Sequence, residues 1–250
     1  MGVKNIFGFI FIVAMSLLAI FSSYTDSVYK LRIQNQHSNL IISSPDQIVV
    51  RKSIDSAVRV VSTLEHTSGE GVTSTSSGTY LKYNNKNYVI TSAHSLIGEC
   101  YRTMIIADDY MFECKEFTVM NTVKDIAIIE VQNIFNRKPI KITDILYSET
   151  EAKRQTGIHE KTFYTGYPQA MGPFTFDGKI VSHYIENDMF FVNSYAWAGS
   201  SGSGIFNSNG RLIGVITAVS IANTEHGIDV MEDLVIVTSL TTQDFQGALK

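Results

Sequence analysis

The sequence predicts an all-β fold of the sandwich or barrel type, with little helix. Short segments with the composition of β-strands occur along most of the chain, and polar clusters such as residues 83–87 and 207–210 separate them at regular intervals. The strand-like segments are residues 57–64, 79–83, 88–91, 104–107, 126–131, 162–165, 179–183, 189–193, 212–219 and 234–240. At 250 residues the chain suits one domain or two small ones.

The chain begins with an apolar run. Residues 6–21 are almost wholly apolar, and no charged residue occurs between Lys4 and Asp26. The run is at the short end for a membrane-spanning helix, and it matches a signal-peptide cleavage site poorly. We therefore expect residues 1–22 to be an uncleaved membrane anchor, with a cleaved signal segment of a secreted protein as the alternative. Lys4 before the run predicts that the remaining chain faces the periplasm or the exterior.

Two further segments flank the predicted strands. Residues 23–52 are polar and mixed in composition, and we interpret them as a stalk that leads into the folded part, residues 53–250. Residues 241–249 can form one short C-terminal helix, capped by Thr241 or Thr242.

Charge and composition argue against nucleic acid and metal ions as partners. The net charge is −4, and the basic pairs at residues 51–52 and 153–154 are isolated, without aromatic residues between them. This pattern argues against binding to nucleic acid. No cluster of His and Cys has the spacing of a structural zinc site, so we expect no metal.

The two cysteines, Cys100 and Cys114, lie in a predicted hairpin whose turn is residues 107–110. They can form a disulfide if the domain is in an oxidising compartment. Two buried free thiols are an equally acceptable interpretation, because the two positions are not obviously in register.

Three segments carry residues suited to nucleophilic catalysis. His94 follows a strand-like segment and enters a turn of small residues, Asp125 precedes an apolar strand, and Ser201 lies in a loop of Gly and Ser. A serine hydroxyl needs a base that takes its proton and a third group that orients the base. His94 and Asp125 are candidates for these two roles.

The loop around Ser201 also offers hydrogen-bond donors. Small residues at Gly199 and Gly202 allow a tight turn, in which the backbone N–H groups of Gly199 and Ser201 can point into one small cavity. Such a pair stabilises the oxyanion of a tetrahedral intermediate. The order His, Asp, Ser excludes an α/β-hydrolase, in which the serine comes first, and Ser203 occupies the position where that fold needs glycine.

The motifs together resemble those of chymotrypsin-like (trypsin-fold) serine peptidases, most closely the bacterial Deg/HtrA-type and glutamyl-endopeptidase branches. The resemblance covers roughly residues 55–245. It rests on residues 77–79, 89–94, 125–127, 166–168, 178–182, 199–204 and 210–215.

The resemblance implies a fold and a set of roles. It implies two antiparallel six-stranded β-barrels, the first at about residues 53–145 and the second at about residues 155–240. His94 would be the general base, Asp125 would orient it, Ser201 would be the nucleophile, and the N–H groups of Gly199 and Ser201 would form the oxyanion hole. The substrate would be a protein or peptide, and no cofactor is implied.

The resemblance also places the specificity pocket. Its floor would lie near Tyr195 and its wall would be Thr217, Ala218 and Val219. The absence of an acidic residue at the floor argues against Lys or Arg before the scissile bond (the P1 position). Ile216 stands where glutamyl-specific relatives have histidine, which argues against Glu. We expect small or medium apolar P1 residues.

Two function classes are open at this stage. The first is a membrane-tethered serine endopeptidase that acts outside the cytoplasm, either on other proteins or only on its own stalk near residues 40–50. The second is a binding or scaffolding module that keeps the fold but is catalytically weak. Ser200, where many relatives have Asp, and Ser203, at a customary Gly position, motivate the second. A peptide at Gly199 turned away from Ser201 would favour it.

Overall fold

The computed structural model describes residues 44–65, 71–145, 156–184, 188–224 and 227–246, without the side chains of residues 219–232. The predicted anchor or signal segment, residues 1–22, and the stalk up to residue 43 lie outside this part. Within the described ranges, no helix combines the length and the apolar character needed to cross a membrane.

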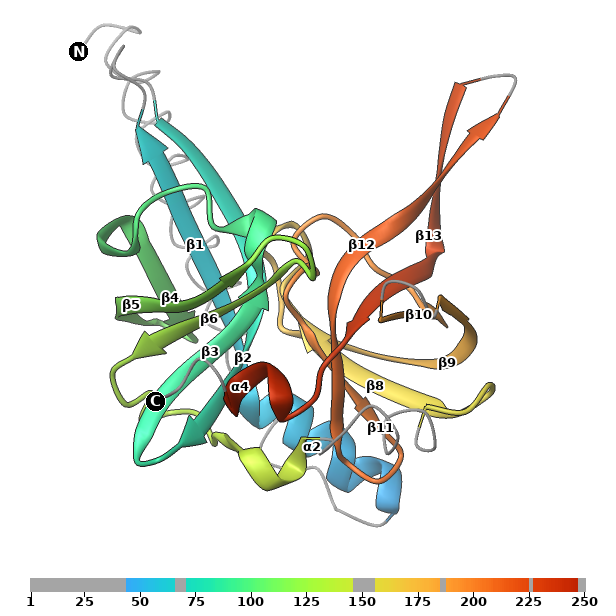
Figure 1. Ribbon diagram of the computed structural model, residues 1–250, viewed down its shortest axis with the longest axis horizontal. Helices are drawn as coiled ribbons and strands as arrows, with labels where there is room; N and C mark the ends of the chain where they lie inside the picture. Colours follow the sequence, from blue (N-terminus) through green and yellow to red (C-terminus); the bar gives the residue numbers. More distant parts are fainter. Residues whose placement is uncertain (1–43, 66–70, 146–155, 185–187, 225–226, 247–250) are drawn as a thin grey trace, which may run out of the picture. The chain divides into compact units, whose positions relative to one another are not determined.

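The first barrel is built from strands β1 to β6, and the order β1-β4-β5-β6-β3-β2 closes because β1 also pairs with β2 (Figure 1). A short strand, β7 (Ile140–Lys141), pairs in parallel with β2. The strands are β1 (Ala57–Glu65), β2 (Gly71–Tyr83), β3 (Lys86–Ser92), β4 (Thr103–Ala107), β5 (Tyr110–Asn121) and β6 (Ile126–Val131).

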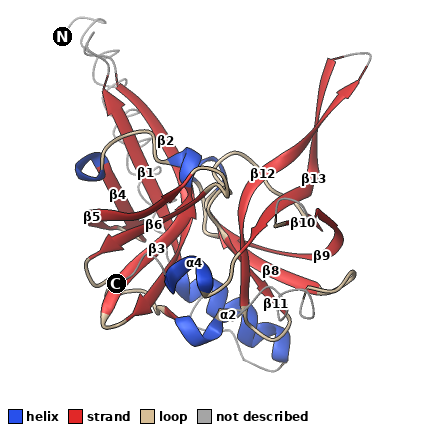
Figure 2. Ribbon diagram, viewed as in Figure 1, coloured by secondary structure: helices blue, strands red, loops and turns tan. Residues whose placement is uncertain are grey.

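The second barrel closes in the order β10-β13-β12-β11-β8-β9. The prediction of an all-β fold with two six-stranded antiparallel barrels is therefore confirmed, and strands dominate the described residues in Figure 2. The strands are β8 (Lys161–Gly166), β9 (Phe174–Tyr184), β10 (Met189–Asn193), β11 (Gly204–Asn207), β12 (Leu212–Thr224) and β13 (Gly227–Ser239).

A shared apolar core joins the two barrels. Strand β6 is apolar on both faces, because Ile128 packs into the shared core while Ile129 packs inside the first barrel. The second barrel contributes Phe163 and Phe206 to the shared core. A strand buried on both sides has a continuous apolar sequence. Asp125, the residue just before β6, is thereby placed at the edge of this core.

Helix α2 (Pro45–Ser56) belongs to the folded unit, which begins at Ser44. The Ser44 hydroxyl accepts a hydrogen bond from Gln47 N, and proline follows at the first helical position, so the sequence starts the helix there. Ser53 Oγ donates to Thr165 Oγ1 at 2.9 Å and holds the helix on the second barrel. Residues 45–52, which we expected to be stalk, are therefore part of the folded unit.

The C-terminal helix is short, as predicted. Helix α4 (Gln243–Gln246) follows Thr241, whose backbone N–H donates to Asp244 Oδ2 at 2.8 Å. Phe245 is buried in the shared core. The Asp244 carboxylate thus connects the first turn of the helix to Thr241.

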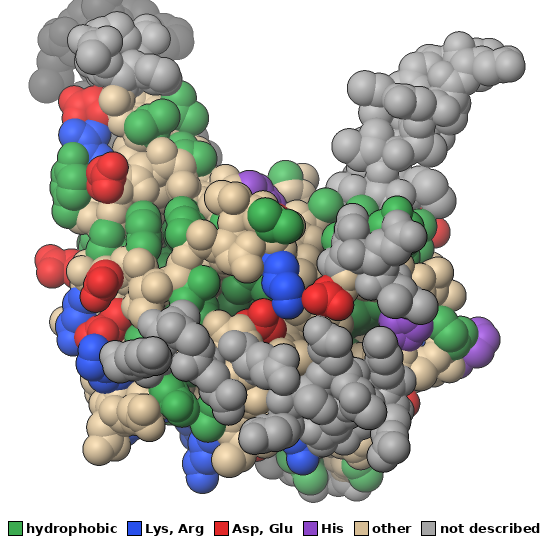
Figure 3. Space-filling model, in the orientation of Figure 1, with side chains coloured by type: hydrophobic (Ala, Val, Ile, Leu, Met, Phe, Trp, Pro, Cys, Tyr) green, Lys and Arg blue, Asp and Glu red, His purple; other side chains and the backbone are tan. Residues whose placement is uncertain are grey.

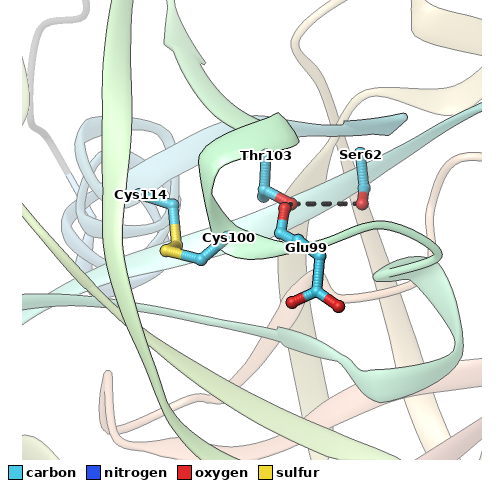
Figure 4. The surroundings of a disulfide bond; sticks show 5 residues. All are labelled: Ser62, Glu99, Cys100, Thr103 and Cys114. Carbon is cyan, nitrogen blue, oxygen red and sulfur yellow. Dashed lines mark hydrogen bonds between the residues drawn. A yellow bond between two sulfur atoms is a disulfide. The ribbon is translucent and has the colours of Figure 1, made fainter. Parts of the chain in front are cut away.

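Cys100 and Cys114 form a disulfide, with their Cα atoms 5.4 Å apart (Figure 4). Cys100 begins the 3₁₀ turn η2 (Cys100–Arg102), and Cys114 lies in β5. Beside the disulfide, Thr103 Oγ1 donates to Ser62 Oγ at 3.1 Å and joins β4 to β1. Of the two interpretations that the sequence allowed, the disulfide is the one observed. The turn at residues 107–110 pairs β4 with β5 and so brings the two cysteines together.

Removing this disulfide is expected to destabilise the domain by about 3 kcal/mol, because the bond closes a loop with a sequence separation of 14 residues. The double substitution Cys100→Ser and Cys114→Ser should lower the urea midpoint, and the slope of the transition should rise, because the unfolded chain without the cross-link exposes more surface. Adding a reducing agent to the wild type should reproduce the shift and leave the double variant unaffected. Equal midpoints for wild type and variant would contradict this expectation.

Charges of both signs alternate on the face shown in Figure 3, where Lys and Arg side chains lie beside Asp and Glu side chains. Ion pairs within the described residues include Arg137 with Asp108 at 2.6 Å and Lys124 with Asp244 at 3.0 Å. Interspersed charge of this kind is typical of a solvated protein surface.

Candidate active site

Strand pairing brings His94 and Asp125 together. Strands β3 and β6 are antiparallel, and Ser92 at the end of β3 is opposite Ile126 at the start of β6. His94 lies in the 3₁₀ turn η1 (Ala93–Ser95) directly after β3, and Asp125 directly precedes β6. The two residues are distant in sequence but adjacent in space, because the end of β3 lies beside the start of β6.

Both carboxylate oxygens of Asp125 are engaged by His94. Oδ2 is 2.6 Å from His94 Nδ1, and Oδ1 accepts from the His94 backbone N–H at 2.8 Å. The backbone of Asp125 is in the left-handed region, with φ of +53°, and its carbonyl accepts from Ala93 N at 3.2 Å. An ionised carboxylate only accepts hydrogen bonds, so Nδ1 carries the proton and Nε2 of the neutral ring is free to accept one.

The loop that contains Ser201 is closed by Ser200. Ser200 is buried, its N–H donates to Trp197 O at 2.8 Å, and its Oγ accepts from Trp197 N at 3.2 Å. Ser203 N then donates to Ser200 O at 3.1 Å. The hydroxyl at this position therefore organises the turn internally, without the carboxylate that many relatives have there.

Gly202 permits a close approach between this loop and the first barrel. Its φ is +87°, and a Cβ atom there would lie 2.0 Å from Ser77 O and 2.3 Å from Thr91 Oγ1. Only glycine combines this conformation with this spacing. The neighbouring Ser201 is linked to the same strand, because Ser77 N donates to Ser201 O at 2.8 Å.

The segments of Ser201 and His94 meet through this contact. Thr91, at the end of β3, donates from Oγ1 to Ser77 O at 2.7 Å, so Ser77 connects the loop of Ser201 to the strand that leads to His94. Within the described residues the Ser201 hydroxyl makes no hydrogen bond with His94. Hydrogen bonds of this kind are often long before substrate binds. The structure thus joins His94 to Asp125 directly, whereas the strand that leads to His94 is joined to the loop of Ser201 through Thr91 Oγ1 and Ser77.

The peptide between Ala198 and Gly199 is oriented by the turn η4 (Pro168–Ala170). Gln169 N donates to Ala198 O at 2.6 Å. Because the C=O and N–H of a trans peptide point in opposite directions, the N–H of Gly199 is directed away from Gln169. Neither Gly199 N nor Ser201 N has an acceptor in the described part of the chain, so both donors are available.

The sequence interpretation missed the residues that support this peptide. Gln169 and Ala170 both have positive φ, +52° and +60°, and Arg59 Nη1 donates to Ala170 O at 3.0 Å. Non-glycine residues in this region are uncommon and are kept in place by their surroundings. No composition signal marks Gln169 and Ala170, because they contribute only backbone atoms to these contacts.

Tyr195 is exposed. The residue is 60% exposed, and its ring stacks on Trp197, with centroids 6.3 Å apart. Its carbonyl accepts a hydrogen bond from the buried hydroxyl of Tyr164, and burial raises the pKa of Tyr164, so that hydroxyl stays protonated as a donor. The expected pocket floor is therefore a side chain that lies in contact with solvent.

The expected wall residues lie along β12. Thr217 is buried, with its Oγ1 3.3 Å from Thr238 Oγ1, and Ala218 is exposed and opposite Ile236 of β13. The side chain of Val219 is outside the described residues. Among the residues with described side chains, no group of three or more His, Cys, Asp or Glu is arranged to hold a metal ion.

Comparison with known proteins agrees with this fold. A family model for the trypsin-like peptidase domain matches residues 69–215. The solved structure of the serine endoprotease from Yersinia pestis is similar, with a TM-score of 0.58 and 18% sequence identity. The match covers 80% of this chain and 63% of that chain, so this chain spans less than two thirds of its length. At this identity the similarity concerns the fold.

Proposed function

We propose that this chain, which belongs to the trypsin-like peptidase domain family, is a serine endopeptidase that acts through the triad His94, Asp125 and Ser201. The observation that carries the proposal is the pair of hydrogen bonds from His94 to the Asp125 carboxylate, at 2.6 and 2.8 Å. They orient the imidazole and leave Nε2 ready to accept a proton.

The proposed reaction has two stages. Ser201 Oγ bonds to the carbonyl carbon of the scissile peptide while its proton moves to His94 Nε2. The carbon–nitrogen bond then breaks, and the same proton passes to the leaving amine, which leaves an ester on Ser201. Water then attacks the ester carbon while giving a proton to His94 Nε2. The bond from that carbon to Ser201 Oγ breaks, His94 returns the proton to Oγ, and the second product leaves as a carboxylic acid.

The two free N–H groups of Gly199 and Ser201 support a catalytic role over the binding module. Because Ala198 O accepts from Gln169 N, the Gly199 N–H of the same peptide points away from Gln169. Both N–H groups are therefore available to an oxyanion. Ser200, one of the two replacements that motivated the alternative, is accommodated because it closes its own turn.

Labelling with a fluorophosphonate probe tests the function. The folded wild type should form one adduct, and peptide mapping by mass spectrometry should place it on Ser201. A folded sample that stays unlabelled over long incubation would refute the proposed activity. Labelling at another serine would keep the activity but overturn the assignment of the nucleophile.

Small or medium apolar P1 residues are the proposed preference. Ile216 is buried, the exposed Ala218 has little bulk, and Tyr195 offers no negative charge to a basic side chain. Fluorogenic peptides that differ only at P1 should be cleaved with higher kcat/KM for Ala, Val or Leu than for Lys or Glu. In an apolar pocket, two substrates that differ by one methylene group differ in kcat/KM by about 10- to 200-fold. A preference for Lys or Glu would contradict the proposal.

We also propose that the domain acts outside the cytoplasm and is tethered by residues 1–22. The disulfide between Cys100 and Cys114 supports the location, because structural disulfides persist in oxidising compartments. The full chain should stay in the membrane fraction after an alkaline wash and be digested by protease added outside intact cells. Recovery in the cytoplasmic fraction would contradict both parts.

A further inference from the structure

Ser77 is the point at which the separate parts of the proposed active site are connected. It lies in β2 of the first barrel and is completely buried. Its Oγ donates to Gly199 O at 2.7 Å and accepts from Tyr167 N at 2.8 Å. Its own N–H donates to Ser201 O at 2.8 Å, and its carbonyl accepts from Thr91 Oγ1 at 2.7 Å. The hydroxyl is thus satisfied both as donor and as acceptor.

The hydrogen bond from Ser77 Oγ to Gly199 O matters because it is one of two contacts that fix the peptides on either side of Gly199. The preceding peptide is held by Gln169 N on Ala198 O, and the following peptide is held by Ser77 Oγ on Gly199 O. Gly199 has a φ of +95°, a conformation that glycine adopts and leaves without steric penalty. The direction of its N–H therefore depends on these anchors and not on a side chain of its own.

The hydroxyl reaches across from the first barrel to the second. Ser77 is in β2, whereas Tyr167 follows β8 and Gly199 lies in the loop before β11. A substitution that removes only Oγ leaves the backbone bonds of Ser77 to Ser201 and Thr91 in place. What is lost is the hold on the Gly199 carbonyl, together with the acceptor for Tyr167 N.

We propose that Ser77 is a positioning residue of the oxyanion hole, whose hydroxyl keeps the Gly199 N–H aimed at the developing oxyanion. This inference rests on the proposed peptidase function. Ser77 is not expected to touch substrate. It acts by holding a donor in place before the reaction, which matters most in the transition state, where the negative charge develops.

The test compares Ser77→Ala with Ser76→Ala. Ser76 is the neighbour in the same strand, is equally buried, and its Oγ has no hydrogen-bond partner. We expect Ser77→Ala to lower kcat by about 10- to 100-fold with little change in KM, because misplacing one donor weakens transition-state binding selectively. Ser76→Ala should keep wild-type kinetics. Equal kcat values for the two variants would overturn the proposal.

A transition-state analogue separates positioning from a general effect on stability. A peptide boronate should bind Ser77→Ala more weakly by the same factor as kcat/KM falls, while both variants are measured well below their melting temperature. Loss of activity without loss of boronate affinity would overturn the proposal. If Ser77→Ala does not fold, Ser77→Cys takes its place, because the thiol is a weaker donor of similar size. Wild-type kcat in Ser77→Cys would then be the contrary result.

The two proposals fail in different ways. A labelled wild type with unchanged kinetics in Ser77→Ala would overturn the role of Ser77 alone. A folded wild type that fluorophosphonate does not label would overturn the peptidase function and the role of Ser77 with it.

Discussion

Ser201→Ala is expected to lower kcat by a factor on the order of 10⁶ while leaving the protein folded. The substitution removes the atom that bonds to the scissile carbonyl, and neither the backbone of the loop nor the pair of His94 and Asp125 depends on it. Because Ser201 O still accepts from Ser77 N, the oxyanion donors stay in place. Residual turnover above the uncatalysed rate should come from these donors and from substrate binding.

The measurement is kcat on a fluorogenic peptide, with the urea midpoint recorded for the same samples. Ser203→Ala is the matched control, since Ser203 lies in the same loop and its buried Oγ has no hydrogen-bond partner. Its activity should equal that of the wild type, and removing an unsatisfied hydroxyl should not destabilise the fold. Activity retained in Ser201→Ala would refute the nucleophile assignment.

Asp125→Asn is expected to lower kcat by a factor on the order of 10⁴ at neutral pH. The reason follows from the two hydrogen bonds to His94. The amide oxygen of Asn can replace Oδ1 as the acceptor of the His94 backbone N–H, which leaves the NH₂ group facing Nδ1. Nδ1 must then accept, Nε2 must carry the proton, and the ring can no longer take a proton from Ser201.

Steady-state kinetics and the rate of fluorophosphonate labelling check this prediction. Both should fall together, because both need the same deprotonation of Ser201. Asp46→Asn is the control, since it removes a carboxylate that pairs with Lys161 on the surface, at 2.7 Å. A variant Asp125→Asn with wild-type labelling would show that another group orients His94.

The strands that the sequence did not predict have a common physical basis. Strand β5 carries Lys115 and Glu116 next to each other, and its register shifts between Cys114 and Glu116, so the alternation that marks a strand is interrupted there. Strand β11 has only four residues and begins with Gly204. Both form because neighbouring strands supply their backbone hydrogen bonds. Tertiary context here outweighs local propensity.

Helix α2 was assigned to the stalk for a related reason. Its residues, 45–56, include Arg51, Lys52 and Asp55, and such a polar sequence is typical of a linker. In the structure Lys52 Nζ donates to Gly210 O at 2.7 Å and pairs with Asp144 at 3.0 Å. These partners are distant in sequence, so composition alone does not reveal that the helix packs on the barrels.

Reading the residues in order was enough to identify an all-β chain and to single out an imidazole, a carboxylate and an alcohol in suitable local surroundings, because side-chain chemistry and apolar periodicity are written in the residue types. The aim of the Gly199 N–H, the exposure of Tyr195 and the central place of Ser77 emerged only from the folded chain. They depend on contacts between segments that are distant in sequence, such as Ser77 Oγ on Gly199 O, and the residue types alone do not specify which segments pack together.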